Sequence, residues 1–181
     1  MSKVVVLEGS PTRGGNTDLM CEAFAQATEA AGHQVKVIPV GRMRIDGCRG
    51  CRACYKAGKP CVFGDKDEWN GIASDLLAAD AIVFATPVYW FGWAAQAKAA
   101  LDRMFCFLPK GEEFRGKKCA FLSAAADGED VFDAPKMVFE KSVALLGWEV
   151  IGEVCAANCG EHGKVRETDC LAQAAALAAF L

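Results

Sequence analysis

Short apolar runs alternate along the chain with longer segments in which apolar residues recur every three or four positions. The first run, Val4–Leu7, is β-branched and stops at Gly9, which is typical of a buried strand. Asn16 or Thr17 can then cap a helix that Gly32 ends. This alternation predicts strands at 3–7, 34–40, 81–86, 118–124 and 148–154, and helices at 16–31, 67–79, 93–105, 132–146 and 168–181.

Strands that alternate with helices require right-handed crossovers, which produce a parallel sheet with helices on both faces. The predicted fold class is therefore α/β, a doubly wound five-stranded parallel sheet in the order 2-1-3-4-5. No repeat or linker divides the sequence, so we expect one domain over residues 1–181. The one long insertion is a Cys-rich loop after the second strand, at about residues 44–64.

In a doubly wound sheet, ligands bind beyond the carboxyl ends of the strands where the strand order reverses, here between the first and third strands. The loop after the first strand leads directly into a helix N-terminus, where free N–H groups favour an anion. Its candidate ligand residues are Ser10, Thr12, Arg13, Gly15, Asn16 and Thr17. Neither standard nucleotide fingerprint is present, so an ordinary polar turn with a helix cap remains an equal alternative.

The loop after the third strand is unusually apolar for a ligand-binding edge. A flat, partly apolar ligand would explain it, and a packed loop or a subunit interface are the alternatives. The residues concerned are Pro87, Val88, Tyr89, Trp90, Phe91 and Gly92. Together the two loops describe a ligand with an anionic tail and a flat ring, and FMN fits that description.

At these loops the chain resembles the flavodoxin-like NAD(P)H-dependent FMN reductases. Gly9-Ser-Pro11, Gly15-Asn-Thr17 and Thr86-Pro-Val-Tyr89 match the family's motifs, and Asp102-Arg103 ends the next helix in the family manner. Thr12 replaces the usual basic residue, although Arg13 is adjacent. The resemblance spans about residues 3–105 and implies a flavodoxin-like fold, bound FMN and NAD(P)H as a possible substrate. Ser123 stands in the third flavin loop, which is usually glycine-rich, and is a further candidate contact.

Four of the ten cysteines lie in the insertion with the spacing C-x2-C-x2-C-x6-C: Cys48, Cys51, Cys54 and Cys61. No leader peptide and no apolar run long enough for a bilayer is visible, so we expect a cytoplasmic protein without membrane contact. A reducing compartment argues against disulfides. The spacing favours an iron–sulfur cluster, while zinc or free thiols remain alternatives.

Within the flavin family, this spacing resembles the iron–sulfur flavoproteins, which hold a [4Fe-4S] cluster beside FMN. The loop follows the second strand, so we expect it to emerge at the same sheet edge as the flavin loops. Cys21, Cys106, Cys119 and Cys170 lie in helix or strand patterns and are interpreted as core residues.

The net charge of −3 gives no reason to expect nucleic-acid binding. The Cys-rich loop is nevertheless basic, a property that would stabilise an anionic cluster or dock an acidic partner such as ferredoxin, unless the loop is simply solvated. Its basic residues are Arg42, Arg44, Arg49, Arg52, Lys56 and Lys59.

The sequence therefore predicts an FMN-dependent oxidoreductase that passes electrons between a [4Fe-4S] cluster and FMN to a small acceptor, with NAD(P)H or ferredoxin as donor. The alternatives are an NAD(P)H-dependent FMN or quinone reductase without a cluster, and a non-enzymatic flavodoxin-like electron carrier. No catalytic side chain is expected, because the flavin carries the chemistry. The apolar loop favours a homodimer or homotetramer.

Overall fold

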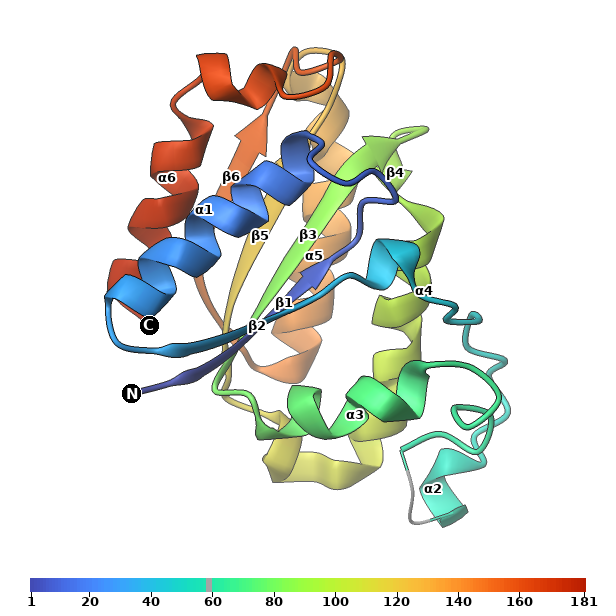
Figure 1. The fold of residues 1–181 in the computed structure, drawn as a ribbon. Helices are drawn as coiled ribbons and strands as arrows, with labels where there is room; N and C mark the ends of the chain where they lie inside the picture. The colour runs from blue at the N-terminus through green and yellow to red at the C-terminus, as the bar shows by residue number, and fades with distance from the viewer. Residues whose placement is uncertain (58–59) are drawn as a thin grey trace.

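The computed structural model describes residues 1–57 and 60–181, and it contains a central sheet with helices on both faces (Figure 1). Five parallel strands lie in the order β2-β1-β3-β5-β6. They are β1 (Lys3–Glu8), β2 (Gln34–Ile38), β3 (Ala81–Tyr89), β5 (Lys118–Ala124) and β6 (Glu149–Ala156). The predicted flavodoxin-like order is confirmed.

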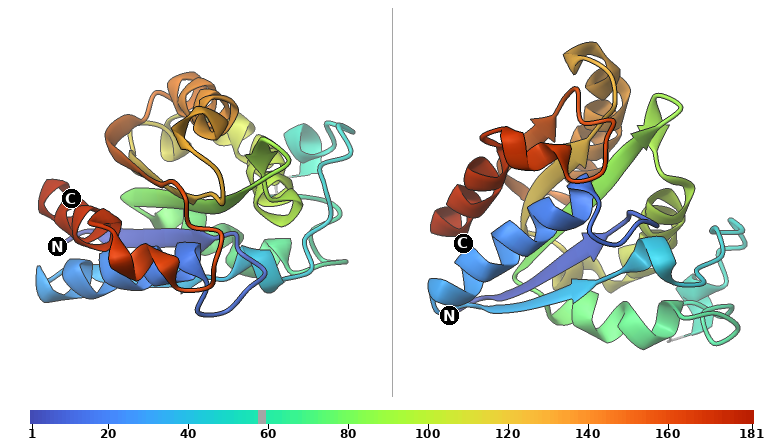
Figure 2. Two further views of the ribbon diagram at one scale, coloured as in Figure 1. Left: turned by 90° about the horizontal axis from the view of Figure 1, so that it is seen from above. Right: turned by 45° about the horizontal axis from the view of Figure 1, so that its top comes forward.

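Alternate side chains of the strands enter two separate cores, as expected for a sheet buried on both faces. Val4 and Val6 of β1 pack under α1 (Asn16–Ala30) and α6 (Cys170–Ala176). Val5 and Leu7 face the other core, which contains α3 (Trp69–Ala78), α4 (Ala95–Arg103) and α5 (Asp133–Leu146). Figure 2 shows these two helical layers on opposite sides of the sheet.

The structure differs from the sequence prediction at the third strand, which was expected to end at Thr86. Instead β3 continues to Tyr89 and turns back into a short antiparallel strand, β4 (Gly92–Trp93), so that the predicted aromatic loop is a hairpin. Trp90 and Phe91 form its turn with φ angles of 52° and 59°, a conformation that bulky residues rarely adopt. The two turn positions hold neither glycine nor asparagine, the residues that usually indicate such a turn, so the sequence did not predict this hairpin.

The remaining elements are short turns, apart from one longer segment. The Cys-rich loop contains a single helical turn, α2 (Cys54–Ala57), and α4 continues into a long irregular 3₁₀ segment, η2 (Met104–Phe114). The other 3₁₀ turns are η1 (Val40–Arg42), η3 (Glu129–Phe132), η4 (Lys164–Glu167) and η5 (Leu177–Phe180). Among the described residues, no helix is both long and apolar enough to cross a bilayer.

Candidate functional site

A cleft of about 400 Å³ opens at the carboxyl ends of the strands, between the loop after β1 and the end of β3. We call it the edge cleft. Its lining residues are Ser10, Thr12, Gly15, Asn16, Thr17, Pro87, Val88, Tyr89, Ala124, Ala125, Ala126, Cys159, Gly160 and His162. The position agrees with the rule that ligands bind where the strand order reverses.

The structure divides the predicted ligand residues into three groups. Eight of them line the edge cleft: Ser10, Thr12, Gly15, Asn16, Thr17, Pro87, Val88 and Tyr89. Trp90 and Phe91 instead line a neighbouring hollow of about 250 Å³, which shares Val88, Ala125 and Ala126 with the cleft. Arg13, Gly92 and Ser123 line neither space, and the Ser123 hydroxyl donates to the carbonyl of Thr86 at 2.8 Å.

The loop after β1 is organised by its own side chains. The Ser10 hydroxyl accepts the N–H of Thr12 at 3.1 Å, and Asp18 accepts the N–H of Gly14 at 2.7 Å. No side chain caps the N-terminus of α1 at Gly15. The first N–H groups of α1 are therefore available to an anion in the cleft, where the helix dipole also favours negative charge.

Sequence reasoning placed the loop after β5 at the ligand site through Ser123, but it did not include the loop after β6 among the ligand residues. The amide nitrogen of Asn16 donates to the carbonyls of Cys159 and Glu161, and its oxygen accepts the N–H of Val165 at 3.0 Å. The loop after β6 is thereby held against the loop after β1. Because this loop lies about 150 residues from Asn16 in the sequence, neither spacing nor periodicity could pair them.

A buried ion pair braces the loop after β1 from below. Glu8, which ends β1, is fully buried, and its carboxylate lies 2.7 Å from the Arg42 guanidinium and accepts the N–H of Ser10. Arg42 also donates to the carbonyl of Ser10 at 3.2 Å. Burial raises the pKa of Glu8 to about 7, against the lowering effect of Ser10 and Arg42.

We expect this carboxyl to make the stability of the protein depend on pH. Between the ordinary pKa of 4.5 and about 7, the folded state keeps a proton that the unfolded chain has released, so the free energy of unfolding should fall as the pH rises. The fall is about 3 kcal/mol if the whole shift is expressed. Urea unfolding at about pH 5 and about pH 8 measures it. The Glu8→Gln variant should lose this slope, and equal slopes in both proteins would contradict the assignment.

The four cysteines of the Cys-rich loop line one small cavity of about 20 Å³. We call this group, with the inner-wall residue Cys106, the cysteine cage: Cys48, Cys51, Cys54, Cys61 and Cys106. Cys48 and Cys51 are exposed, Cys54 and Cys61 are partly buried and Cys106 is buried. Among the described residues, no group of three or more His, Cys, Asp or Glu is placed to hold a metal ion as it stands. The thiols are gathered without converging on one point.

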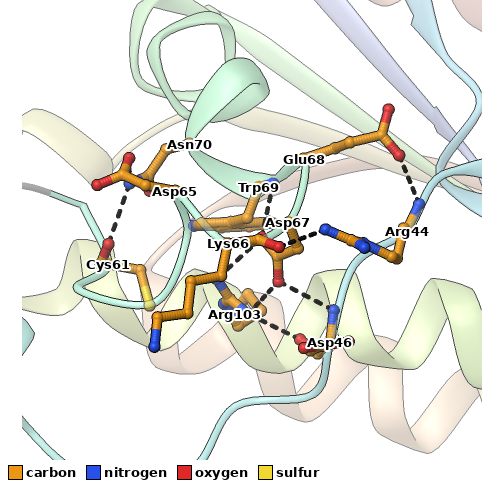
Figure 3. Close-up of polar contacts among 10 residues, drawn as sticks. All are labelled: Arg44, Asp46, Cys61, Asp65, Lys66, Asp67, Glu68, Trp69, Asn70 and Arg103. Carbon is orange, nitrogen blue, oxygen red and sulfur yellow. Dashed lines mark hydrogen bonds and ion pairs between the residues drawn. The ribbon is translucent and has the colours of Figure 1, made fainter.

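Both ends of the Cys-rich loop are fastened to the end of α4 by Arg103 (Figure 3). Its guanidinium donates to the Asp46 carbonyl at 2.9 Å and pairs with the Asp67 carboxylate at 2.8 Å. Asp67 in turn accepts the N–H groups of Asp46 and Trp69. Burial alone would raise the pKa of Asp67, but these N–H donors and the Arg103 charge lower it below its ordinary value.

Further contacts at the base of the loop complete this clamp. Arg44 donates to the carbonyl of Lys66, and its own N–H donates to Glu68 at 2.6 Å. The Asn70 amide donates to the carbonyl of Cys61 at 3.0 Å (Figure 3). The loop that carries the thiols therefore has a fixed base, although its outer cysteines are exposed.

The Cys-rich loop starts at the sheet edge where it was expected, but its cysteines lie farther along α4. The loop does leave the sheet beside the edge cleft, because Arg42 contacts Ser10 there. The cysteine cage, however, is lined by Arg103, Phe105 and Cys106, at and beyond the far end of α4 (Figure 1). A helix of nine residues separates those positions from the cleft end by about 12 Å. Strand order predicts where the Cys-rich loop starts, whereas the contacts of Arg103 hold its cysteines at the end of α4.

The basic side chains of the loop differ in their partners and exposure. Arg42 and Arg44 are engaged with Glu8 and with the backbone of Lys66. Arg49, Arg52 and Lys56 are exposed around the cage, and the Arg49 guanidinium lies 4.6 Å from the centre of the Phe63 ring. Lys59 lies outside the described residues.

The chemistry of the cage fits an anionic metal–sulfur group. Besides five thiols, two buried donors near the cage have no acceptor among the described residues: Arg103 Nε and Trp69 Nε1. Buried donors without partners are rare, and sulfur anions would supply acceptors. Arg103 itself lines the cavity. Cysteine thiolates with adjacent N–H donors and positive charge are a ligand set suited to an iron–sulfur cluster.

Comparison with known proteins identifies the family of this chain. Residues 2–162 match the family model of the NADPH-dependent FMN reductases. The chain belongs to this family. An iron–sulfur flavoprotein of Archaeoglobus fulgidus is 33% identical over 161 residues, which cover 88% of this chain and 77% of that protein.

A second iron–sulfur flavoprotein of Archaeoglobus fulgidus is 33% identical over 60% of this chain and 47% of its own length. The chain thus matches about half the length of that relative. Among solved structures, the azoreductase AzrA superposes with a TM-score of 0.75 at 16% identity, covering 99% of this chain and 100% of that one. This last likeness shows the flavodoxin-like fold, which the present member of the FMN reductase family shares.

Proposed function

We propose that this chain is an FMN-dependent oxidoreductase that holds FMN in the edge cleft and a [4Fe-4S] cluster in the cysteine cage. The observation that supports it most is the edge cleft itself, where the uncapped N-terminus of α1 meets the apolar end of β3. A free helix N-terminus suits the phosphate, and an apolar wall suits the flavin ring. When bound, these cofactors supply hydride and single-electron chemistry, and the protein positions them.

The proposed roles of the predicted ligand residues follow from the loops in which they lie. Ser10, Thr12, Arg13, Gly15, Asn16 and Thr17 would surround the phosphate end. Pro87, Val88, Tyr89, Trp90, Phe91, Gly92 and Ser123 would lie toward the ring. Thr17 and Ser10 are almost fully buried, so a hydrogen bond from either to a phosphate would be shielded from water.

In the cage, Cys48, Cys51, Cys54 and Cys61 are the proposed cluster ligands. The cavity as it stands has room for about one ion, so a four-iron cluster requires the exposed outer part of the loop to open. This size is the observation that favours the second candidate, an NAD(P)H-dependent FMN or quinone reductase without a cluster.

Three kinds of partner are proposed. The exposed Arg49, Arg52 and Lys56 beside the cage favour an acidic electron donor such as ferredoxin. Self-association as a homodimer or homotetramer is supported by the turn of the β3–β4 hairpin, where Trp90 is 97% exposed, and by an apolar groove of about 450 Å³ between α4 and α5. A small-molecule acceptor completes the proposed reaction.

The experiment that tests this function uses protein loaded with FMN under anaerobic conditions. NADH, NADPH and reduced ferredoxin are added separately, and loss of the visible flavin bands is followed. We expect at least one donor to reduce the bound flavin, which then passes electrons to a quinone. Failure to bind FMN, or a bound flavin that no donor reduces, would contradict the proposal.

A further inference from the structure

Cys106 places a fifth thiol in the wall of the cysteine cage. It belongs to η2, is 5% exposed and lines the same cavity as the four loop cysteines. The sequence places it in a helical pattern, far along the chain from the C-x2-C-x2-C-x6-C motif, and favours a core role. The Arg103 clamp is what brings the two segments together, because Arg103 precedes Cys106 by three residues and holds both ends of the loop.

The five thiols differ in depth. Cys106 is buried, Cys54 and Cys61 are partly buried, and Cys48 and Cys51 are exposed, although all five line the same cavity. Cys54, Cys61 and Cys106 are therefore the inner thiols of the cage, and Cys48 and Cys51 are its outer thiols.

A buried donor lies near Cys106. Trp69 is fully buried and packs against Phe107, the residue that follows Cys106. Its indole N–H has no acceptor in hydrogen-bond geometry among the described residues. A thiolate at Cys106 would be a stronger acceptor for this N–H, so the surroundings include a group that stabilises the ligating form.

We propose that Cys106 is a fifth ligand position of the cysteine cage and can bind metal in place of Cys48. This inference rests on the proposed metal-binding role of the cage. In the exchange, a metal–sulfur bond to Cys106 forms as the bond to Cys48 breaks. The Cys106 thiol gives up its proton to solvent, and the released Cys48 thiolate takes one, so the charge of the site is unchanged and no oxidant is needed.

Anaerobic titration with Co²⁺ tests this ligand exchange, because thiolate-to-cobalt absorption reports the number of bound thiolates. The proteins compared are the wild type, Cys48→Ala, Cys48→Ala with Cys106→Ala, and the matched control Cys48→Ala with Cys119→Ala. Cys119 is a fully buried cysteine in β5. We expect Cys48→Ala and the control to keep the tetrathiolate spectrum with affinity within about tenfold of the wild type. In the Cys48→Ala/Cys106→Ala protein, the thiolate-to-cobalt absorption should fall by the contribution of one thiolate, and the affinity for Co²⁺ should fall on the order of 100-fold.

Equal affinity and spectrum in Cys48→Ala and Cys48→Ala/Cys106→Ala would overturn the role of Cys106 and leave the proposed cluster intact. A wild type that binds neither Co²⁺ nor iron would remove both proposals together. Near-ultraviolet circular dichroism and FMN binding check that each variant is folded. If Cys106→Ala is not folded, Cys106→Ser keeps the size of the side chain but is a poor ligand, and the same comparison decides the question.

Discussion

Replacing Arg103 by Met should lower the free energy of unfolding by about 3–5 kcal/mol, because it leaves the Asp67 carboxylate buried without its partner. Both side chains are almost completely buried, at 3% and 1% exposure. The variant should also lose the fastening of both ends of the Cys-rich loop, since the Asp46 carbonyl loses its donor as well. Urea unfolding measures the first effect, and limited proteolysis of the loop measures the second.

The same helix offers a matched control. Lys98 forms an ion pair with Asp102 at 2.6 Å, but both side chains are about half exposed, so Lys98→Met should cost no more than about 1 kcal/mol. Adding Asp67→Asn to Arg103→Met should recover part of the lost stability by removing the unpaired charge. If Arg103→Met is as stable as Lys98→Met, the clamp does not hold the loop as argued.

FMN affinity should fall by at least about tenfold when Ser10 and Thr17 are both changed to Ala, at about 1–3 kcal/mol for each hydrogen bond lost to a charged group. Ser10 also holds the N–H of Thr12, so its loss should loosen the loop that faces the phosphate. Fluorescence titration of the folded variant with FMN measures the change.

Thr28→Ala is the control for this experiment. Thr28 is a fully buried threonine near the other end of α1, and its hydroxyl lies outside the edge cleft. The Thr28→Ala substitution should therefore leave FMN affinity unchanged. Affinity in the Ser10→Ala/Thr17→Ala protein equal to that of the wild type would exclude the loop after β1 as the phosphate site.

The sheet was predictable because its signals are local. β-branched runs such as Val4–Leu7 can be buried only as strands here, and Gly32, with a φ of 84°, ends α1 near the predicted residue. The edge cleft followed from strand order, which fixes where loops begin. The part of the cleft formed by Cys159 and His162 did not, because these residues join it through the distant contacts of Asn16 and Arg13.

The cage was predictable only in part, for the same reason. Spacing identifies four cysteines that a short loop can bring together, and they do line one cavity. It says nothing about Cys106 of η2 or about the Trp69 N–H of α3 that lacks an acceptor, because these residues meet the loop through packing. Nor does it reveal that a buried Arg103–Asp67 pair sets the loop at the far end of α4.

The central claim, that the cage holds a cluster and the cleft holds FMN in one chain, is tested most directly by anaerobic purification followed by an absorption spectrum with iron, sulfide and flavin analysis. The account predicts about four irons and four sulfides for each FMN, with the broad visible absorption of a [4Fe-4S] cluster. The Cys51→Ala protein should keep the flavin bands and lose iron and sulfide. Wild-type protein that carries FMN but takes up no iron after reconstitution, or binds zinc through the same thiols, would contradict the claim and leave a flavin reductase without a cluster.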